Sequence, residues 1–418
     1  MTLLADLLST VFDRRYRRDS VTPFDGRPLA ELTDALVGTE GEISGLALAD
    51  EILTRFEALG DAEKLAFLGD IATRMNIDPE RVRSCLENYE RSPSRASYRA
   101  FATAAEPARQ ELVRRLNRKP GATAALVRMR ADLIRLGGNN PELQALDLDF
   151  RHLFASWFNR GFLVLRPINW ESPAHILDRI IAYEAVHAIH SWDDLRRRLE
   201  PDDRRCFAFF HPAMPDEPLI FVEVALTRGI PGSVQGLLTE EREALAGQDA
   251  DTAVFYSISN CQAGLAGISF GNSLIKQVAA DLATEFPGLK TFVTLSPIPG
   301  LTRWLDSNDI PWEDASPERM QALAAHYLLN ARTSRGLPRD PVARFHLGNG
   351  AIIHAVHAEA DISTKGFAQS GGAMVNYLYD LKQAAQNHER FVSTSEVVAT
   401  SKVRSLATTV TPVSSAES

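Results

Sequence analysis

Apolar side chains recur at helical spacing through the first 160 residues of the chain. One such run contains Leu48, Ile52 and Phe56, which fall on one side of a helix. The sequence Asp78-Pro79-Glu80 predicts the start of another helix, because aspartate caps a helix and proline fits its first turn. The runs lack the alternation that is typical of strands. Residues 1–160 are therefore predicted to form an α-helical domain with a role in packing or oligomerisation.

After residue 160 the pattern changes to short apolar runs that alternate with amphipathic ones. Strands are predicted at 162–165, 206–210, 219–226, 254–259 and 291–295, and helices at 173–183, 268–286 and 318–330. The strand-helix-strand order over 254–295 predicts one crossover between parallel strands, whereas the other strands are expected to pair antiparallel. The predicted fold class is α+β with several domains: the helical bundle, a mixed-sheet α/β domain over 161–410, and a disordered tail over 411–418.

The C-terminal part of this domain contains a turn signal between two apolar runs. Residues 343–347 and 351–358 flank Gly348-Asn349-Gly350, which predicts a β-hairpin because Asn-Gly tolerates positive φ. His346 would then lie on a strand, on the face opposite Phe345 and Leu347. Helices are expected over 372–385 and after Ser393-Thr394-Ser395-Glu396.

Composition narrows the class of protein. The chain has 418 residues, of which 45 are Lys or Arg and 54 are Asp or Glu, for a net charge of −9. A nucleic-acid-binding protein would normally show a basic balance or a basic tail, so no nucleic-acid partner is expected. No apolar run reaches the roughly 20 residues that cross a bilayer, so no membrane span is expected either.

The cysteines and the N-terminal residues indicate the cellular compartment of the protein. Cys85, Cys206 and Cys261 are far apart and odd in number, which predicts neither a disulfide framework nor a zinc site. The arginines near the N-terminus lie among acidic residues and precede no cleavage signal, so an ordinary helix is expected there. We expect a protein of a reducing compartment, the bacterial cytoplasm.

A glycine-containing turn follows the strand at 254–259. Gly264, Gly267 and Gly271 precede or open the next helix, where backbone N–H groups can approach an anion closely. The turn resembles the pyrophosphate loop of GNAT acyltransferases, although its glycine spacing is imperfect. A tight turn that only allows close packing remains the alternative.

Two polar residues are candidates for chemistry. Ser296 ends a strand, and the following Pro297 keeps it extended at the strand edge where ligands of α/β units bind. No Gly-x-Ser-x-Gly surrounds it, which argues against a nucleophile elbow. His346 is the second candidate, although a single strand histidine is more often structural. Glu184 and His187 would share one helix face, where packing is the more common role.

Together these segments resemble the malonyl-CoA decarboxylase family. The matching stretches, in family order, are Tyr183–His187, Trp192–Leu195, His211-Pro212, 218–227, Tyr256–Ser259, 262–276, Leu295–Gly300, Phe345–Ala351 and Met374–Tyr377. The resemblance implies a helical N-terminal domain joined to a GNAT-like catalytic domain, assembled as a homotetramer. One departure is a shorter segment between Ser296 and His346 than animal members have.

The resemblance also implies a reaction and its residues. The family converts malonyl-CoA to acetyl-CoA and CO₂, with its catalytic serine in Ser-Pro-Ile-Pro and its catalytic histidine in Phe-His-Leu-x-Asn-Gly. These positions are Ser296 and His346. The family's CoA-binding stretch falls on Ala266, Gly267, Ile268, Ser269, Phe270, Gly271 and Asn272, with Ile275 one helical turn further.

This reaction is expected to need neither a metal nor an organic cofactor, because the thioester of the substrate accepts the electrons as an enolate. Asn376, Tyr377 and Glu223 are weaker candidates for the pocket wall. Three alternatives stay open: a GNAT-type acyltransferase that needs an amine acceptor, a serine hydrolase using Ser296 and His346, and an acyl-CoA sensor without turnover.

Overall fold

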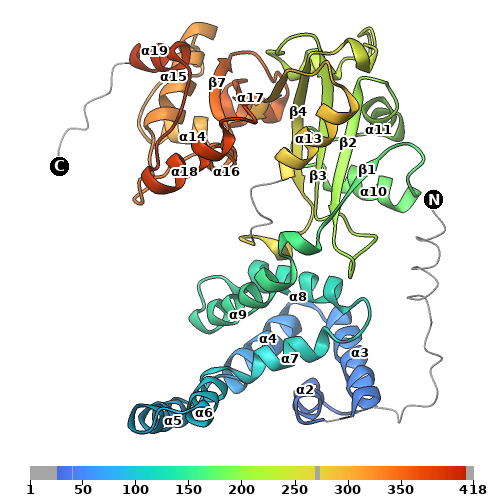
Figure 1. Cartoon of the computed structure of the whole chain (residues 1–418), viewed down its shortest axis with the longest axis vertical. Helices are drawn as coiled ribbons and strands as arrows, with labels where there is room; N and C mark the ends of the chain where they lie inside the picture. The colour runs from blue at the N-terminus through green and yellow to red at the C-terminus, as the bar shows by residue number, and fades with distance from the viewer. Residues whose placement is uncertain (1–25, 40, 269–273, 411–418) are drawn as a thin grey trace. The chain divides into compact units, whose positions relative to one another are not determined.

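The computed structural model describes residues 26–39, 41–268 and 274–410 (Figure 1). The chain divides into two compact units, Met1–Leu153 and Phe154–Ser418. The division lies within helix α9 (Pro141–Trp157). The predicted N-terminal helix and C-terminal tail lie outside the described residues.

The first unit is helical throughout its described part. Its further helices are α2 (Leu29–Gly38), α3 (Glu42–Ala58), α4 (Asp61–Arg74), α5 (Pro79–Arg91), α6 (Arg95–Ala105), α7 (Ala108–Leu116) and α8 (Ala122–Gly137). Asp78 caps α5 as predicted, since its carboxylate accepts hydrogen bonds from the backbone N–H groups of Glu80 and Arg81. Leu48, Ile52 and Phe56 are buried along α3. The predicted α-helical region is confirmed.

The second unit is built on one mixed sheet. Its strands are β1 (Val164–Ile168), β2 (Arg204–Phe210), β3 (Ile220–Thr227), β4 (Thr252–Asn260), β5 (Thr291–Thr294), β6 (Ser296–Pro297), β7 (Ile352–His357) and β8 (Met374–Leu378). They lie in the order β1-β2-β3-β4-β5-β8-β6, and β7 also pairs with β8. Strands β4 and β5 are parallel, and the other pairs are antiparallel. The predicted mixed sheet and its single crossover are confirmed.

Helices cover both faces of this sheet. They are α10 (Ala174–Tyr183), α11 (Trp192–Leu199), α12 (Val234–Leu238), α13 (Leu274–Glu285), α14 (Leu301–Asp306), α15 (Pro317–Asn330), α16 (Pro341–Gly348), α17 (Thr364–Ser370), α18 (Ala384–Thr394) and α19 (Ser401–Thr408). Apolar residues of α13 and α15 form one core with Val222 and Phe255, whereas those of α10 and α11 pack with Phe221 on the other face. A connection from Ser307 to Ser316 joins α14 to α15.

The predicted hairpin around Gly348-Asn349-Gly350 is wrong. Residues 341–348 form helix α16, because Asp340 caps it with a hydrogen bond from the Ala343 N–H and Pro341 occupies its first turn. Gly350, at a φ of +86°, follows the helix rather than joining two strands. A Cβ at this position would lie 1.9 Å from the carbonyl oxygen of Ala384, so the turn requires glycine.

The helix predicted over 372–385 is wrong as well. Met374 to Leu378 form strand β8, which pairs with β5, β6 and β7 and is buried on both faces. The sequence of β8 has apolar residues on both faces and does not alternate, so its period does not distinguish a buried strand from a helix. Ser395 ends helix α18 in a left-handed conformation, and the next helix starts only after Thr400.

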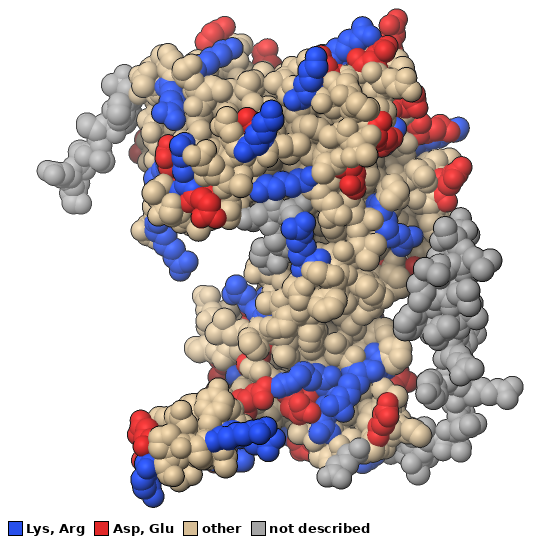
Figure 2. Space-filling model, viewed as in Figure 1, with Lys and Arg blue, Asp and Glu red and all other residues tan. Residues whose placement is uncertain are grey.

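The surface carries charges of both signs. On the face seen in Figure 2, Lys and Arg side chains are interspersed with Asp and Glu in both units. Several ion pairs join residues one helical turn apart, such as Arg196 of α11 and Glu200 at the C-terminal cap of that helix. Exposed pairs of this kind contribute little to stability, so the fold depends on its buried apolar residues.

Candidate active site

The structure brings Ser296 and His346 together. Ser296 is the first residue of β6, and His346 lies in the last turn of α16, 50 residues further along the chain. The Ser296 Oγ lies 3.2 Å from Nε2 of His346. Both residues are buried, with exposed fractions of 5% and 2%. The helix rather than a strand presents the histidine, yet the two side chains meet.

Two further hydroxyl groups extend this contact. Ser296 Oγ donates a hydrogen bond to Oγ1 of Thr294 at 2.8 Å, and Nδ1 of His346 lies 2.8 Å from the phenol oxygen of Tyr379. The sequence analysis missed Thr294 and Tyr379. The only sequence signal for Thr294 is its position two residues before Ser296, which places both side chains on the same face of an extended segment.

The side chains around His346 keep it uncharged. Burial lowers the pKa of His346 to about 3, because the imidazolium form would lose its hydration. Burial also raises the pKa of the Tyr377 and Tyr379 phenols well above the usual value. At neutral pH the site therefore contains a neutral imidazole and protonated phenols.

A cavity of about 260 Å³ opens beside this pair. Ser296 and His346 line it on one side, and the apolar side chains of Ile220, Phe255 and Val342 contribute to its other walls. A mainly apolar pocket with a few convergent polar groups is typical of a small-molecule site. The cavity is of a size to hold an acyl group.

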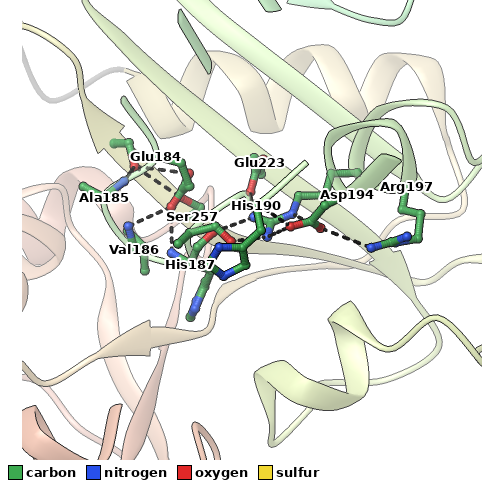
Figure 3. Close-up of polar contacts among 12 residues, drawn as sticks. Glu184, Ala185, Val186, His187, His190, Asp194, Arg197, Glu223 and Ser257 are labelled. Carbon is green, nitrogen blue, oxygen red and sulfur yellow. Dashed lines mark hydrogen bonds and ion pairs between the residues drawn. The ribbon is translucent and has the colours of Figure 1, made fainter. Parts of the chain in front are cut away.

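The segment after α10 also reaches the cavity, through Val186. Glu184 lies just beyond the end of α10, so the predicted shared helix face of Glu184 and His187 is wrong. Its carboxylate accepts hydrogen bonds from the backbone N–H groups of Val186 at 2.7 Å and His187 at 2.8 Å, and from Ser257 Oγ at 2.7 Å (Figure 3). The carboxylate thus closes the segment into a tight turn.

Two cations also hold this segment. The Arg198 guanidinium donates to the carbonyl oxygens of His187 at 2.8 Å and Ala188 at 3.1 Å. Lys365 Nζ donates to the carbonyl oxygen of Ala185. The backbone from 184 to 188 is therefore held by charged groups that come from separate parts of the second unit.

Glu223 is buried on β3, close to Glu184 (Figure 3), and does not line the cavity. Its Oε2 lies 3.3 Å from the Arg198 guanidinium, whereas its Oε1 has no partner among the described residues. Burial, reinforced by the nearby Glu184 carboxylate, raises the pKa of Glu223 to about 8 against the opposing effect of Arg198. Arg198 divides its donors among several acceptors, so it compensates Glu223 only in part.

The other two weak candidates support the pair without lining the cavity. Tyr377 packs against the His346 ring. Asn376 Nδ2 donates to the Thr294 carbonyl oxygen at 2.8 Å, which fixes the end of β5. Among the described residues, no group of three or more His, Cys, Asp or Glu side chains could hold a metal ion.

Sequence comparison gives the family. A sequence model of the malonyl-CoA decarboxylase C-terminal domain matches residues 161–316 and 308–416, and one of the N-terminal domain matches 75–158. The chain belongs to the malonyl-CoA decarboxylase family. A mouse protein named mitochondrial malonyl-CoA decarboxylase is 30% identical over 97% of this chain and 92% of its own. The resemblance inferred from the motifs is confirmed.

Solved structures of the family have the same fold. Malonyl-CoA decarboxylase from Rhodopseudomonas palustris is 48% identical, with a TM-score of 0.85 over 90% of this chain and 98% of its own. The protein of that name from Agrobacterium vitis is 46% identical, with a TM-score of 0.85 over 91% and 99%. The whole architecture, not one domain, is shared with these family members.

The stretch that the family resemblance implies for CoA is only partly visible. Ala266, Gly267 and Ile268 are described, and Gly267 has a φ of +74°, which favours glycine. Ser269, Phe270, Gly271 and Asn272 lie outside the described residues. Ile275 lies on α13 and is buried in the core that this helix forms with the sheet. No described helix is long and apolar enough to span a membrane.

Proposed function

We propose that this family member decarboxylates malonyl-CoA to acetyl-CoA and CO₂ in the cavity lined by Ser296 and His346. The observation that supports this site is the 3.2 Å contact between their side chains at the wall of an otherwise mainly apolar pocket. The activity is that of a carboxy-lyase. No metal or organic cofactor enters the proposed reaction.

The bond that breaks joins the malonyl carboxylate to the methylene carbon. Its electron pair moves into the thioester as an enolate, CO₂ leaves, and one proton is then added to the methylene carbon to give the methyl group of acetyl-CoA. The enzyme must hold the breaking bond perpendicular to the thioester plane and stabilise the enolate oxygen. Ser296 and His346 are the polar groups proposed to contact the carboxylate or the enolate and to deliver the proton.

The walls of the cavity favour this outcome. Ile220, Phe255 and Val342 offer no hydrogen bond to an anion. A carboxylate is poorly solvated beside such side chains, whereas CO₂ is uncharged and the enolate charge is spread over the thioester. The environment therefore destabilises the reactant relative to the transition state.

The CoA moiety and the assembly complete the proposal. The turn from Ala266 to Asn272 would contact CoA, as the family resemblance implies. The chain would act as a homo-oligomer, a tetramer by the same resemblance, in the bacterial cytoplasm. Light scattering of the purified protein would give the mass of the assembly directly.

The decisive experiment measures CO₂ and acetyl-CoA release from malonyl-CoA by purified protein, with a chelator and without an amine. Ser296→Ala and His346→Ala are each expected to lower kcat by about 10²-fold or more. Ser393→Ala, at an exposed position of α18, serves as the control and should keep full activity.

Each alternative has its own signature in this assay. Turnover only after an amine is added would identify an acyltransferase. Release of free CoA from acetyl-CoA would identify a hydrolase, and binding of acyl-CoA without turnover a sensor. Any of these three results would contradict the proposed decarboxylation.

A further inference from the structure

Thr294 accepts two hydrogen bonds next to the proposed catalytic pair. It is the last residue of β5 and is fully buried. Its Oγ1 accepts from Ser296 Oγ at 2.8 Å and from the backbone N–H of Tyr377 at 3.2 Å. A hydroxyl oxygen has two acceptor positions, so these two donors occupy both.

The direction of these bonds determines what His346 presents. Ser296 has one hydroxyl proton, and it points to Thr294. Ser296 therefore faces the Nε2 atom of His346, 3.2 Å away, with a lone pair. A hydrogen bond between the two then requires the proton to be on Nε2.

The other ring nitrogen of His346, Nδ1, is consistent with a proton on Nε2. A neutral imidazole has a single N–H, so with Nε2 protonated, Nδ1 is an acceptor. The Tyr379 phenol lies 2.8 Å from Nδ1 and can donate its proton there. Along this chain Tyr379 donates to Nδ1 of His346, Nε2 of His346 donates to Ser296, and Ser296 donates to Thr294.

We infer that Thr294 is a positioning residue that fixes His346 in the tautomer with the proton on Nε2. The opposite tautomer would place two lone pairs against each other unless the Ser296 hydroxyl turned away from Thr294. In that arrangement Thr294 would have to donate its own hydroxyl proton to Ser296, which reverses the hydrogen bond that Ser296 donates to Thr294.

This tautomer assigns roles to His346 and Ser296 in the proposed decarboxylation, and these roles rest on that proposed function. His346 presents an N–H at Nε2, where it contacts Ser296, and has no acceptor there. It cannot take the proton of Ser296, because Nε2 already has one, so Ser296 is not activated as a nucleophile. The arrangement distinguishes the site from that of a serine hydrolase, although the same two residue types are present.

The test measures the tautomer directly, without substrate. Protein labelled with ¹⁵N in histidine gives ring-nitrogen signals by NMR, and the His346 signals are those that vanish in His346→Gln. We expect the Nε2–H form in the natural protein and in Thr294→Ser, which keeps the hydroxyl. Thr294→Val should show a substantial population of the Nδ1–H form. Retention of only the Nε2–H form in Thr294→Val, or an Nδ1–H form in the natural protein, would overturn the inference.

A second variant separates Thr294 from Tyr379 and serves if Thr294→Val does not fold. Tyr379→Phe removes the donor to Nδ1 but leaves Thr294 and Ser296 in place. The Nε2–H form should persist in this variant. Its loss would mean that Tyr379 and not Thr294 fixes the tautomer, which would contradict the inference.

Kinetics give the functional readout. Thr294→Val is expected to lower kcat for malonyl-CoA by about 10²-fold with little change in KM, and Thr294→Ser should restore it. If the natural protein fails to decarboxylate malonyl-CoA, the proposed function falls while the tautomer result stands. If it does decarboxylate but Thr294→Val keeps the tautomer and kcat, only the role of Thr294 is overturned.

Discussion

The imidazole of His346 lies against the phenol ring of Tyr377, with ring centroids 4.5 Å apart and an angle of 23° between the planes. Both residues are buried, so the stack contributes to excluding water from the imidazole. The resulting low pKa of His346, about 3, means that this residue acts in its neutral form. Tyr377 thus contributes to the chemistry through its ring, from outside the cavity.

The pH dependence of turnover follows from this stack. Because the pKa of His346 is about 3, far below the usual 6.5, kcat should show no inflection from this group between about pH 5 and 8. Tyr377→Leu should let water reach the ring and raise the pKa of His346, so that an acid limb enters the measured range. A flat kcat profile in Tyr377→Leu would contradict this explanation, and Tyr98→Leu on the exposed surface of α6 is the control.

Glu223 is expected to make the protein less stable at high pH. Its pKa rises from the usual 4.5 when unfolded to about 8 when folded. Below about 4.5 both states are protonated and the group has no effect on the free energy of unfolding. As pH rises from there toward 8, only the unfolded state loses its proton, so stability declines.

Urea unfolding at pH 6 and pH 8.5 would check this expectation for Glu223. The free energy of unfolding of Glu223→Gln should decline less between these two pH values than that of the natural protein. Glu389→Gln, at an exposed position of α18, should decline as much as the natural protein. An equal decline in Glu223→Gln would show that Glu223 is already ionised in the folded state.

Asp340 links helix capping to catalysis. It accepts a hydrogen bond from the Ala343 N–H at 2.8 Å and starts the helix that presents His346. Asp340→Ala should cost about 1 kcal/mol of stability and also lower kcat, since the helix start would fray. Asp340→Asn, an equally good cap, should recover most of both.

A matched variant separates capping in general from this particular cap. Ser316 caps α15 by accepting a hydrogen bond from the Arg319 N–H. Ser316→Ala should lower stability without the loss in kcat. Thermal unfolding and steady-state kinetics on the two alanine variants make the comparison, and equal effects on kcat would remove the special role of Asp340.

Glu184 should influence substrate binding more than turnover. Its carboxylate holds the turn that places Val186 at the cavity, while it does not itself line the cavity. Glu184→Ala should raise KM for malonyl-CoA by about tenfold, the effect of losing one or two such hydrogen bonds. Glu184→Gln keeps an oxygen for both backbone N–H groups and should be close to normal.

Hydrogen exchange provides the structural check on Glu184. The amides of Val186 and His187 should exchange faster in Glu184→Ala, because their acceptor is gone. Glu200→Ala, on the exposed end of α11, should leave both amides protected. Protected amides together with a normal KM in Glu184→Ala would show that the turn holds without its carboxylate.

The sequence was sufficient to single out Ser296 and His346 as candidates but not to predict the helix that presents His346. Ser296 and His346 both stand in motifs that could be recognised locally. The Asn-Gly signal predicts a hairpin around His346, whereas Asp340 and Pro341 start a helix there. The first residues of a helix carry the stronger local information here, since Asp340 accepts from the Ala343 N–H, a donor that the helix itself cannot satisfy.

Thr294 and Tyr379 could not have been found in the same way. Each is a common residue type with no motif of its own. Their position depends on the pairing of β8 with β5 and β6, which joins segments that are distant in sequence. Because β8 was predicted as a helix, the contact between Tyr379 and His346 could not be anticipated.

The connection from Ser307 to Ser316 lies between the segments that carry Ser296 and His346. The two matched stretches of the family's C-terminal domain, 161–316 and 308–416, overlap within it. Ser296 is fixed before it by pairing with β8, and His346 after it by the cap of α16. An insertion at this connection is therefore expected to leave the distance between the two side chains unchanged. The same property makes it a natural place to graft a reporter or a regulatory module.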